Sequence, residues 1–221
     1  MTISVLFPTT GRPDRAEACL RQLRDTTAGH DIEVIAAVDA DLETRERLDP
    51  LADRITYSDS YRGCSRAWND ALALSTGDPV VFAADDLIWH EGWLDAALER
   101  LGEFPDGWGL VGFNDGHWRE DLSTHYLMSR RFIIEVLGGV VAWDWYRHSF
   151  NDLEVNERAK RAGRYAWCED AHVTHEHWLF GDRPQDSTDT RTLGDHEAAA
   201  DTYRARLNAG FPVDYPPVIT A

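Results

Sequence analysis

The sequence predicts a single α/β domain built on a mostly parallel sheet that is flanked by helices. Strand-like apolar runs alternate with amphipathic helical segments over residues 1–101, which is typical of a parallel sheet with helices on both faces. The chain has 221 residues, the length of one large domain. Hydrophobic residues make up 43% and charged residues 28%, an ordinary globular composition that supplies a sizeable core.

The elements of the first half follow from short apolar runs and from helix-capping residues. Strands are expected at residues 3–7, 33–38, 54–57 and 80–83. The first helix begins at Pro13, which suits the first helical position. The second is capped by Ser65 and closed by Gly77. A third, over 91–101, is amphipathic.

The second half is less regular. Strands are expected at 110–113, 126–129 and 165–168, and helices at 130–137, 152–162 and 196–209. Residues 181–195, GDRPQDSTDTRTLGD, are polar and rich in breakers, so they are predicted to form a mobile loop. Residues 196–221 are then a C-terminal helix and a Pro-rich tail.

Charge and composition exclude some classes of function. The net charge of −17 does not steer the chain to bare nucleic acid or to an anionic membrane. No apolar run approaches the roughly 20 residues of a membrane span, and the N-terminus lacks the basic region of a signal peptide. The three cysteines are far apart and lack metal-site spacing, so we expect reduced thiols in a cytoplasmic protein.

Two adjacent carboxylates, Asp85 and Asp86, end the strand in VVFAADDLIW. Like charges side by side repel unless a cation lies near them. A hard divalent ion such as Mg²⁺ or Mn²⁺ prefers oxygen ligands and bridges to substrate phosphates. The alternative is a turn or helix-capping role. The turn after Phe7, Asp39 and this pair all fall at carboxyl ends of predicted strands, where such sheets bind ligands.

Two further segments carry candidate site residues. HVTHEHW places His175 and His177 after a strand, and imidazole is a good ligand for Mn²⁺ or Zn²⁺. FNDLEVNERAKRAG places Asp152 at a helix N-terminus and Glu154 two residues further on. Asp152 is either a helix cap or a general base at the rim of a site.

The order of these segments resembles a family-2 glycosyltransferase with the GT-A fold. The resemblance rests on five segments spread over residues 1–180: ISVLFPTTGR at 3–12, AVDAD at 37–41, RGCSRAWNDALALSTGDPVVFAADD at 62–86, THYLMSRRFIIEVLGG at 124–139 and FNDLEVNERAKRAGRYAWCEDAHVTHEH at 150–177. It implies a mixed, mostly parallel, Rossmann-like sheet. Residues 1–101 would form the nucleotide-binding half, and residues 102–180 the acceptor and catalytic half.

The resemblance also implies a role for each matching residue. Asp86 would bind Mn²⁺ or Mg²⁺ with His175 as second ligand, and His177 is the alternative. Asp152 would deprotonate the acceptor, with Glu154 as the alternative. The nucleotide-sugar donor would be held by Pro8, Thr9, Thr10, Arg12, Asp39, Arg62, Asn69 and Asp85. UDP is the commonest donor base in the resembled family, while GDP and dTDP remain open.

The implied activity is inverting, metal-dependent transfer of a sugar from a nucleoside-diphosphate sugar to an acceptor hydroxyl. Acceptors of the resembled family bind near Asp115, His117, Trp118 and Trp143. Such side chains suit a glycan, a protein or a nucleobase-bearing hydroxyl compound, because aromatic faces stack on flat apolar surfaces.

Two other functions compete with this prediction. A sugar-1-phosphate nucleotidyltransferase also uses acidic metal ligands, but it begins with a glycine-rich phosphate loop, and PTTGRPDR lacks the repeated glycines. A non-catalytic GT-A-like binding module is the third possibility. Loss of Asp86 or Asp152 would favour it, and both are present.

Overall fold

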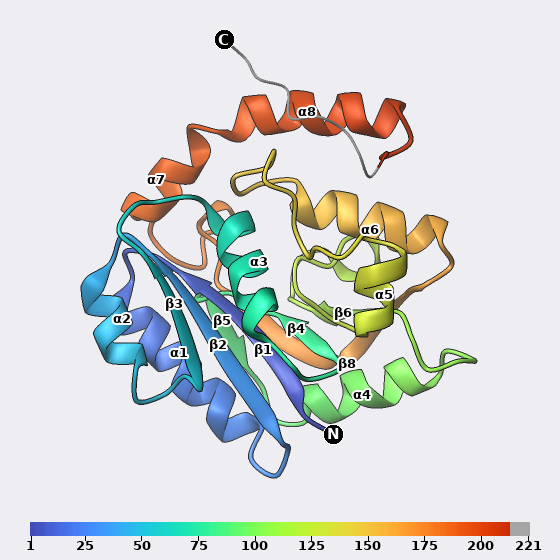
Figure 1. Cartoon of the computed structure of the whole chain (residues 1–221), viewed down its shortest axis with the longest axis horizontal. Coiled ribbons are helices and arrows are strands. Elements are labelled where there is room, and N and C mark those ends of the chain that lie inside the picture. Colours follow the sequence, from blue (N-terminus) through green and yellow to red (C-terminus); the bar gives the residue numbers. More distant parts are fainter. Residues whose placement is uncertain (213–221) are drawn as a thin grey trace.

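An eight-stranded mixed sheet forms the centre of the computed structural model, which describes residues 1–212 (Figure 1). Its strand order is β3-β2-β1-β4-β7-β6-β8-β5. The predicted GT-A-like α/β architecture is confirmed. The last part of the predicted tail, residues 213–221, lies outside the described residues.

The first half of the chain supplies the parallel part of the sheet. Its strands are β1 (Ile3–Thr9), β2 (Ile32–Asp39), β3 (Arg54–Ser58) and β4 (Val80–Phe82), all parallel to one another. The connecting helices are α1 (Pro13–Thr26), α2 (Leu42–Leu48) and α3 (Cys64–Leu74). The carboxyl ends of β1, β2 and β4 therefore meet at one edge of the sheet.

The second half extends the same sheet with mixed directions. Its strands are β5 (Leu87–Trp89), β6 (Leu110–Asn114), β7 (Tyr126–Met128) and β8 (Tyr165–His175). β7 lies antiparallel between β4 and β6, β6 pairs parallel with β8, and β5 pairs antiparallel with β8. The register of the last pair sets Leu87 opposite His175, so the acidic pair at the end of β4 is brought beside the end of β8.

Two apolar layers cover the two faces of the sheet because side chains alternate along the strands. On β1, Val5 and Phe7 face one core and Leu6 faces the other. The first core packs against α1, α2 and α4 (Trp93–Gly102). The second packs against α3, α5 (Arg130–Glu135), α6 (Asn151–Arg161) and α8 (His196–Asn208). In Figure 1, α8 lies above α6 in the view.

Four features differ from the sequence predictions. Helix α2 and strand β5 were not predicted, and β8 continues to His175 rather than ending near 168. The prediction of an irregular loop over 181–195 was wrong for α7 (Ser187–Leu193). This helix starts with a capping box in which Asp186 and Asp189 each accept the other's backbone N–H. Short 3₁₀ turns also occur at Arg119–Asp121 and Trp178–Phe180.

Among residues 1–212, no helix combines the length and the apolar character that crossing a membrane requires.

Candidate active site

A cavity opens at the carboxyl ends of β1, β2 and β4. It contains most of the residues predicted to hold the donor: Pro8, Thr9, Thr10, Arg12, Asp39 and Asp85, together with Asp86. The remaining lining comes from Tyr61, Gly63, Cys64, Ala67, Trp68, Ala84, His148, Thr188 and Thr192. The structure therefore brings the predicted strand-end residues together at the place where α/β sheets bind ligands.

Asp85 is held by its neighbours on the floor of this cavity. Its carboxylate accepts hydrogen bonds from Thr9 Oγ1 at 2.7 Å and from an Arg12 guanidinium nitrogen at 2.9 Å. Burial raises the pKa of Asp85, although the charge of Arg12 opposes this. These contacts fix the direction in which the carboxylate faces the cavity.

Asp86 lies beside two histidines. One carboxylate oxygen is 3.4 Å from His175 Nε2, and ligand atoms of Asp86, His125 and His175 all lie within 4.8 Å of one another. All three residues are buried. Burial opposes ionisation of Asp86, but His175 and Arg12 outweigh it and hold the pKa of Asp86 well below its usual range. Burial together with the charge of His175 lowers the pKa of His125 to about 3.

The cluster fits a divalent metal in its donor set, and its Asp86–His175 pair fits in spacing. Two ligand atoms that share an ion at about 2.1 Å lie about 3.0–3.4 Å apart when the bonds meet near 90–110°. The Asp86–His175 separation matches this. Within residues 1–212, His175 Nδ1 is buried without a hydrogen-bond partner. The alternative ligand His177 lies outside the cluster, and its Nδ1 accepts a hydrogen bond from the backbone of Leu179.

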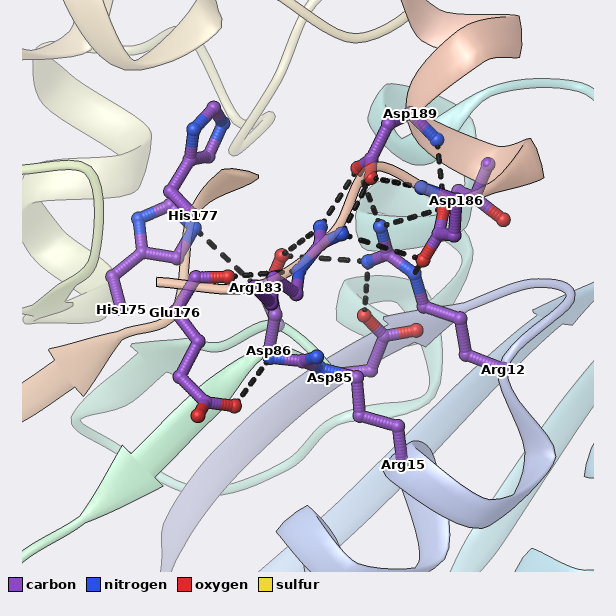
Figure 2. A network of polar contacts seen from close by, with 12 residues as sticks. Arg12, Arg15, Asp85, Asp86, His175, Glu176, His177, Arg183, Asp186 and Asp189 are labelled. Atoms are coloured by element: carbon purple, nitrogen blue, oxygen red, sulfur yellow. Dashed lines mark hydrogen bonds and ion pairs between the residues drawn. The ribbon is translucent and has the colours of Figure 1, made fainter. Parts of the chain in front are cut away.

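Charged residues of the 183–189 segment lie over the acidic pair (Figure 2). Arg12 donates to Asp186 at 2.8 Å and to Asp189 at 2.7 Å. Arg183 also donates to Asp189, at 2.7 Å, and its guanidinium lies 3.7 Å from Asp86. The segment predicted to be a mobile loop is therefore attached to the site by ion pairs.

Two other residues that were predicted to hold the nucleotide-sugar donor, Arg62 and Asn69, do not line the cavity. Arg62 pairs with Asp39, donating from its backbone at 2.7 Å and from its side chain at 2.9 Å. It therefore orients Asp39 and does not line the cavity. Asn69 is a correction: its amide bridges the backbone of Val141 and Ala142. It is not among the residues that line the cavity.

The two candidate bases have opposite surroundings. Asp152 is partly exposed at the first turn of α6. Burial raises the pKa of Asp152. The charge of Asp115 raises it further, whereas the charge of His175 lowers it. Glu154 is fully buried, accepting bonds from Tyr146 Oη at 2.9 Å and from Arg158 and Arg206. Glu154 therefore fastens α6 to α8, and it is not available as a base.

The residues that were predicted to bind the acceptor also differ in whether they are exposed or buried. Trp118 is 43% exposed, and His117 Nε2 lies 2.9 Å from the carbonyl oxygen of His175. Asp115 is buried and accepts the backbone N–H groups of His117 and Trp118. Trp143 is a correction: only 4% of it is exposed, and it packs in the second core under Arg158.

The comparisons with known proteins agree with this geometry. The sequence profile of Glycosyl transferase family 2 matches residues 4–135, more than half of the chain. The chain belongs to this family. A comparison with curated protein sequences finds no significant match.

Solved structures similar to this family 2 member share its fold at low sequence identity. Glucosyl-3-phosphoglycerate synthase from Mycobacterium tuberculosis, in complex with Mn²⁺, UDP and phosphoglyceric acid, is 18% identical, with a TM-score of 0.66 over 97% of this chain and 80% of that one. The mannosyltransferase PcManGT from Pyrobaculum calidifontis, in complex with GDP-Man and Mn²⁺, is 18% identical, with a TM-score of 0.65 over 97% and 76%. TarS from S. aureus is 14% identical, with a TM-score of 0.63; 77% of this chain is covered, but only 35% of TarS.

Several residues of the site were not predicted from the sequence of this family 2 member. His125 is a lone histidine before a short strand, and nothing in its local sequence indicates a metal. Arg183, Thr188 and Thr192 lie in a segment interpreted as a loop, although the spacing of Asp186 and Asp189 could have indicated a helix start. Gly63 stands in the resembling segment at 62–86 but was given no role. In the structure it adopts φ +98°, and a Cβ there would lie 2.5 Å from the carbonyl oxygen of Arg147.

Proposed function

We propose that the chain is an inverting, metal-dependent glycosyltransferase. It moves a sugar from a nucleoside-diphosphate sugar, with UDP as the first candidate base, to a hydroxyl of a glycan, a protein or a nucleobase-bearing compound. The observation that carries this proposal is that the strand-end cavity adjoins the cluster of Asp86, His125 and His175. A donor in this cavity would have its diphosphate next to the cluster.

The donor would be held by the first half of the chain. The turn from Pro8 to Arg12 and the carboxylate of Asp39 line the cavity and would contact the nucleoside. Arg62 keeps Asp39 in place. Similar structures that contain UDP or GDP-Man support a nucleotide donor.

The charge of the diphosphate would be met by residues at the cavity floor. Asp86 and His175 would hold Mn²⁺ or Mg²⁺, which when bound supplies charge neutralisation for a diphosphate leaving group. Arg12 lies at the same place, since it is bonded to Asp85 and is 3.4 Å from Asp86. When a donor binds, the diphosphate oxygens would take the place of the Asp85 and Asp86 carboxylates as partners of the Arg12 guanidinium.

Asp152 would act as the base. The acceptor oxygen forms a bond to C1 of the sugar, the bond between C1 and the diphosphate oxygen breaks, and Asp152 takes the acceptor proton. A raised pKa makes Asp152 a stronger base than an ordinary carboxylate. A single displacement inverts the anomeric centre.

Slow hydrolysis of the donor tests this function without knowledge of the acceptor, because water replaces the hydroxyl. UDP-, GDP- and dTDP-hexoses are incubated with Mn²⁺, and the released nucleotide and the first-formed hexose anomer are followed by chromatography and proton NMR. We expect one donor to be cleaved with inversion. Asp86→Ala should abolish cleavage, while the exposed control Asp170→Ala should retain it. Retention of the donor anomer would contradict inversion, and cleavage of none of the donors would contradict transfer.

A further inference from the structure

His125 is held rigidly beside the predicted metal ligands. It directly precedes β7, and its carbonyl oxygen accepts the N–H of Phe113 from β6 at 3.0 Å. Only 5% of the residue is exposed, and its ring lies 4.8 Å from that of His175 in an edge-on arrangement. The sheet thus fixes where this imidazole lies.

A hydrogen-bond chain determines which nitrogen of His125 carries its proton. Asp115 accepts the hydroxyl proton of Thr124 at 2.8 Å. Thr124 Oγ1 lies 2.9 Å from His125 Nδ1, and because its single proton is already donated, it can only accept there. His125 therefore carries its proton on Nδ1, and Nε2 keeps a free lone pair. A carboxylate-fixed tautomer of this kind is the usual support of metal-binding histidines.

We propose that His125 is a third protein ligand of the metal site, with Asp86 and His175. This rests on the proposed function, which places a metal at Asp86 and His175. Supporting observations are the common separation of the three ligand atoms, within 4.8 Å, the burial of all three residues, and the hydrogen bond at His125 Nδ1 that leaves Nε2 as the free lone pair. Small rotations of the three side chains would bring their ligand atoms within about 4.2 Å of one another. This is the largest separation of two atoms that bind the same ion at about 2.1 Å.

The third ligand has a consequence for metal choice. Two imidazoles and one carboxylate favour Co²⁺ and Zn²⁺, and to a lesser extent Mn²⁺, over Mg²⁺, because Mg²⁺ prefers oxygen ligands. The remaining coordination positions stay open for oxygen atoms of a substrate. The site is therefore selective for transition metals, and this selectivity depends on His125.

Metal titration of the full chain tests the inference without an activity assay. Bound Mn²⁺ is counted by the loss of its free-ion EPR signal, with and without saturating UDP, and Mg²⁺ is then used to displace it. Electron spin-echo modulation from nitrogen reports the number of bound imidazoles. We expect two imidazoles in the wild type and one in His125→Gln. The Mn²⁺ affinity of this variant should fall by about 10–100-fold, with little change in Mg²⁺ affinity.

Two further variants make the result decisive. Thr124→Val keeps His125 but removes the hydrogen bond that fixes its tautomer, so it should weaken Mn²⁺ binding by about 10-fold. His30→Ala, a surface histidine paired with Asp95, should change nothing. Unchanged Mn²⁺ affinity and one imidazole in both wild type and His125→Gln would overturn the inference. If Asp86→Asn still abolished binding in that case, the proposed function would survive. No Mn²⁺ binding by the wild type in either condition would overturn the third ligand as well as the metal site.

Discussion

Asp152 and Glu154 lie two positions apart on α6, and their neighbours give them different chemistry. Glu154 is neutralised by Arg158 and Arg206 in the core, whereas Asp152 stays near His175 with a raised pKa. From the sequence, both were possible bases. The choice depends on Tyr146, Arg158 and Arg206 converging on one carboxylate, which no local pattern of the sequence indicates.

Replacing Asp152 by Asn should lower kcat/KM by about 10²–10⁴-fold, because general-base catalysis is lost while the shape is kept. Catalysis needs the ionised carboxylate. Its pKa is raised above the ordinary 3.8, so the wild-type rate should rise with pH through a midpoint above 3.8, and this acid limb should vanish in Asp152→Asn. Steady-state kinetics across pH measure both effects. The exposed control Asp201→Asn should behave as wild type, and full activity of Asp152→Asn would assign the base elsewhere.

At the scale of elements, α7 borders the strand-end cavity, which is the proposed donor site. The space open to water inside is about 80 Å³, while ligand pockets span about 300–1,000 Å³. Since α7 supplies Thr188 and Thr192 to the lining, we expect it to move when a donor enters. Asp189 joins this helix to both Arg12 and Arg183.

We expect Asp189→Asn to release α7. Loss of its charge-assisted hydrogen bonds should cost about 1–2 kcal/mol locally, so trypsin should cut after the exposed Arg191 about 5–30 times faster. Asp195→Asn, which removes only a 3.6 Å pair with Arg147, is the matched control. UDP with Mn²⁺ should slow the cut in the wild type as the segment closes over the donor. Equal rates of cleavage after Arg191 in all these samples would contradict a movement of α7 relative to the cavity.

On the scale of the whole molecule, the alternation of strands and helices was predictable from apolar patterns and caps. The strand order was not, because it depends on long-range pairing. β7 inserts between β4 and β6, and β5 pairs with β8, and these pairings bring His125 and His175 to Asp86 from three segments. The sequence could therefore predict the strand-end part of the site, and His175 by resemblance, but not His125.

Glu33 links the first strands to the turn before β4. It accepts from Ser4 Oγ at 2.7 Å, Gly77 N at 2.8 Å and the backbone and hydroxyl of Thr76. Although burial opposes ionisation, these donors lower its pKa from 4.5 to about 2. The stabilisation, about 2–3 kcal/mol, is therefore present above pH 4.5 and is lost as the pH falls towards 2. Urea unfolding should show Glu33→Gln destabilised by this amount at pH 7, with a difference that shrinks below pH 4.5. A difference that is constant with pH would contradict the linkage.

The most direct test of the central claim, metal-dependent binding of a nucleotide donor, is a thermal-shift panel. UDP, GDP, dTDP, CDP and ADP are each measured with and without Mn²⁺, on the wild type, on Asp86→Ala and on the control Asp170→Ala. Ligand at 100 times its Kd adds about 2.7 kcal/mol, a shift of several degrees for a domain of this size. We predict stabilisation by one nucleotide, UDP first, only with Mn²⁺, lost in Asp86→Ala and kept in Asp170→Ala. No shift with any nucleotide would contradict the account and would leave a GT-A-like binding module in its place.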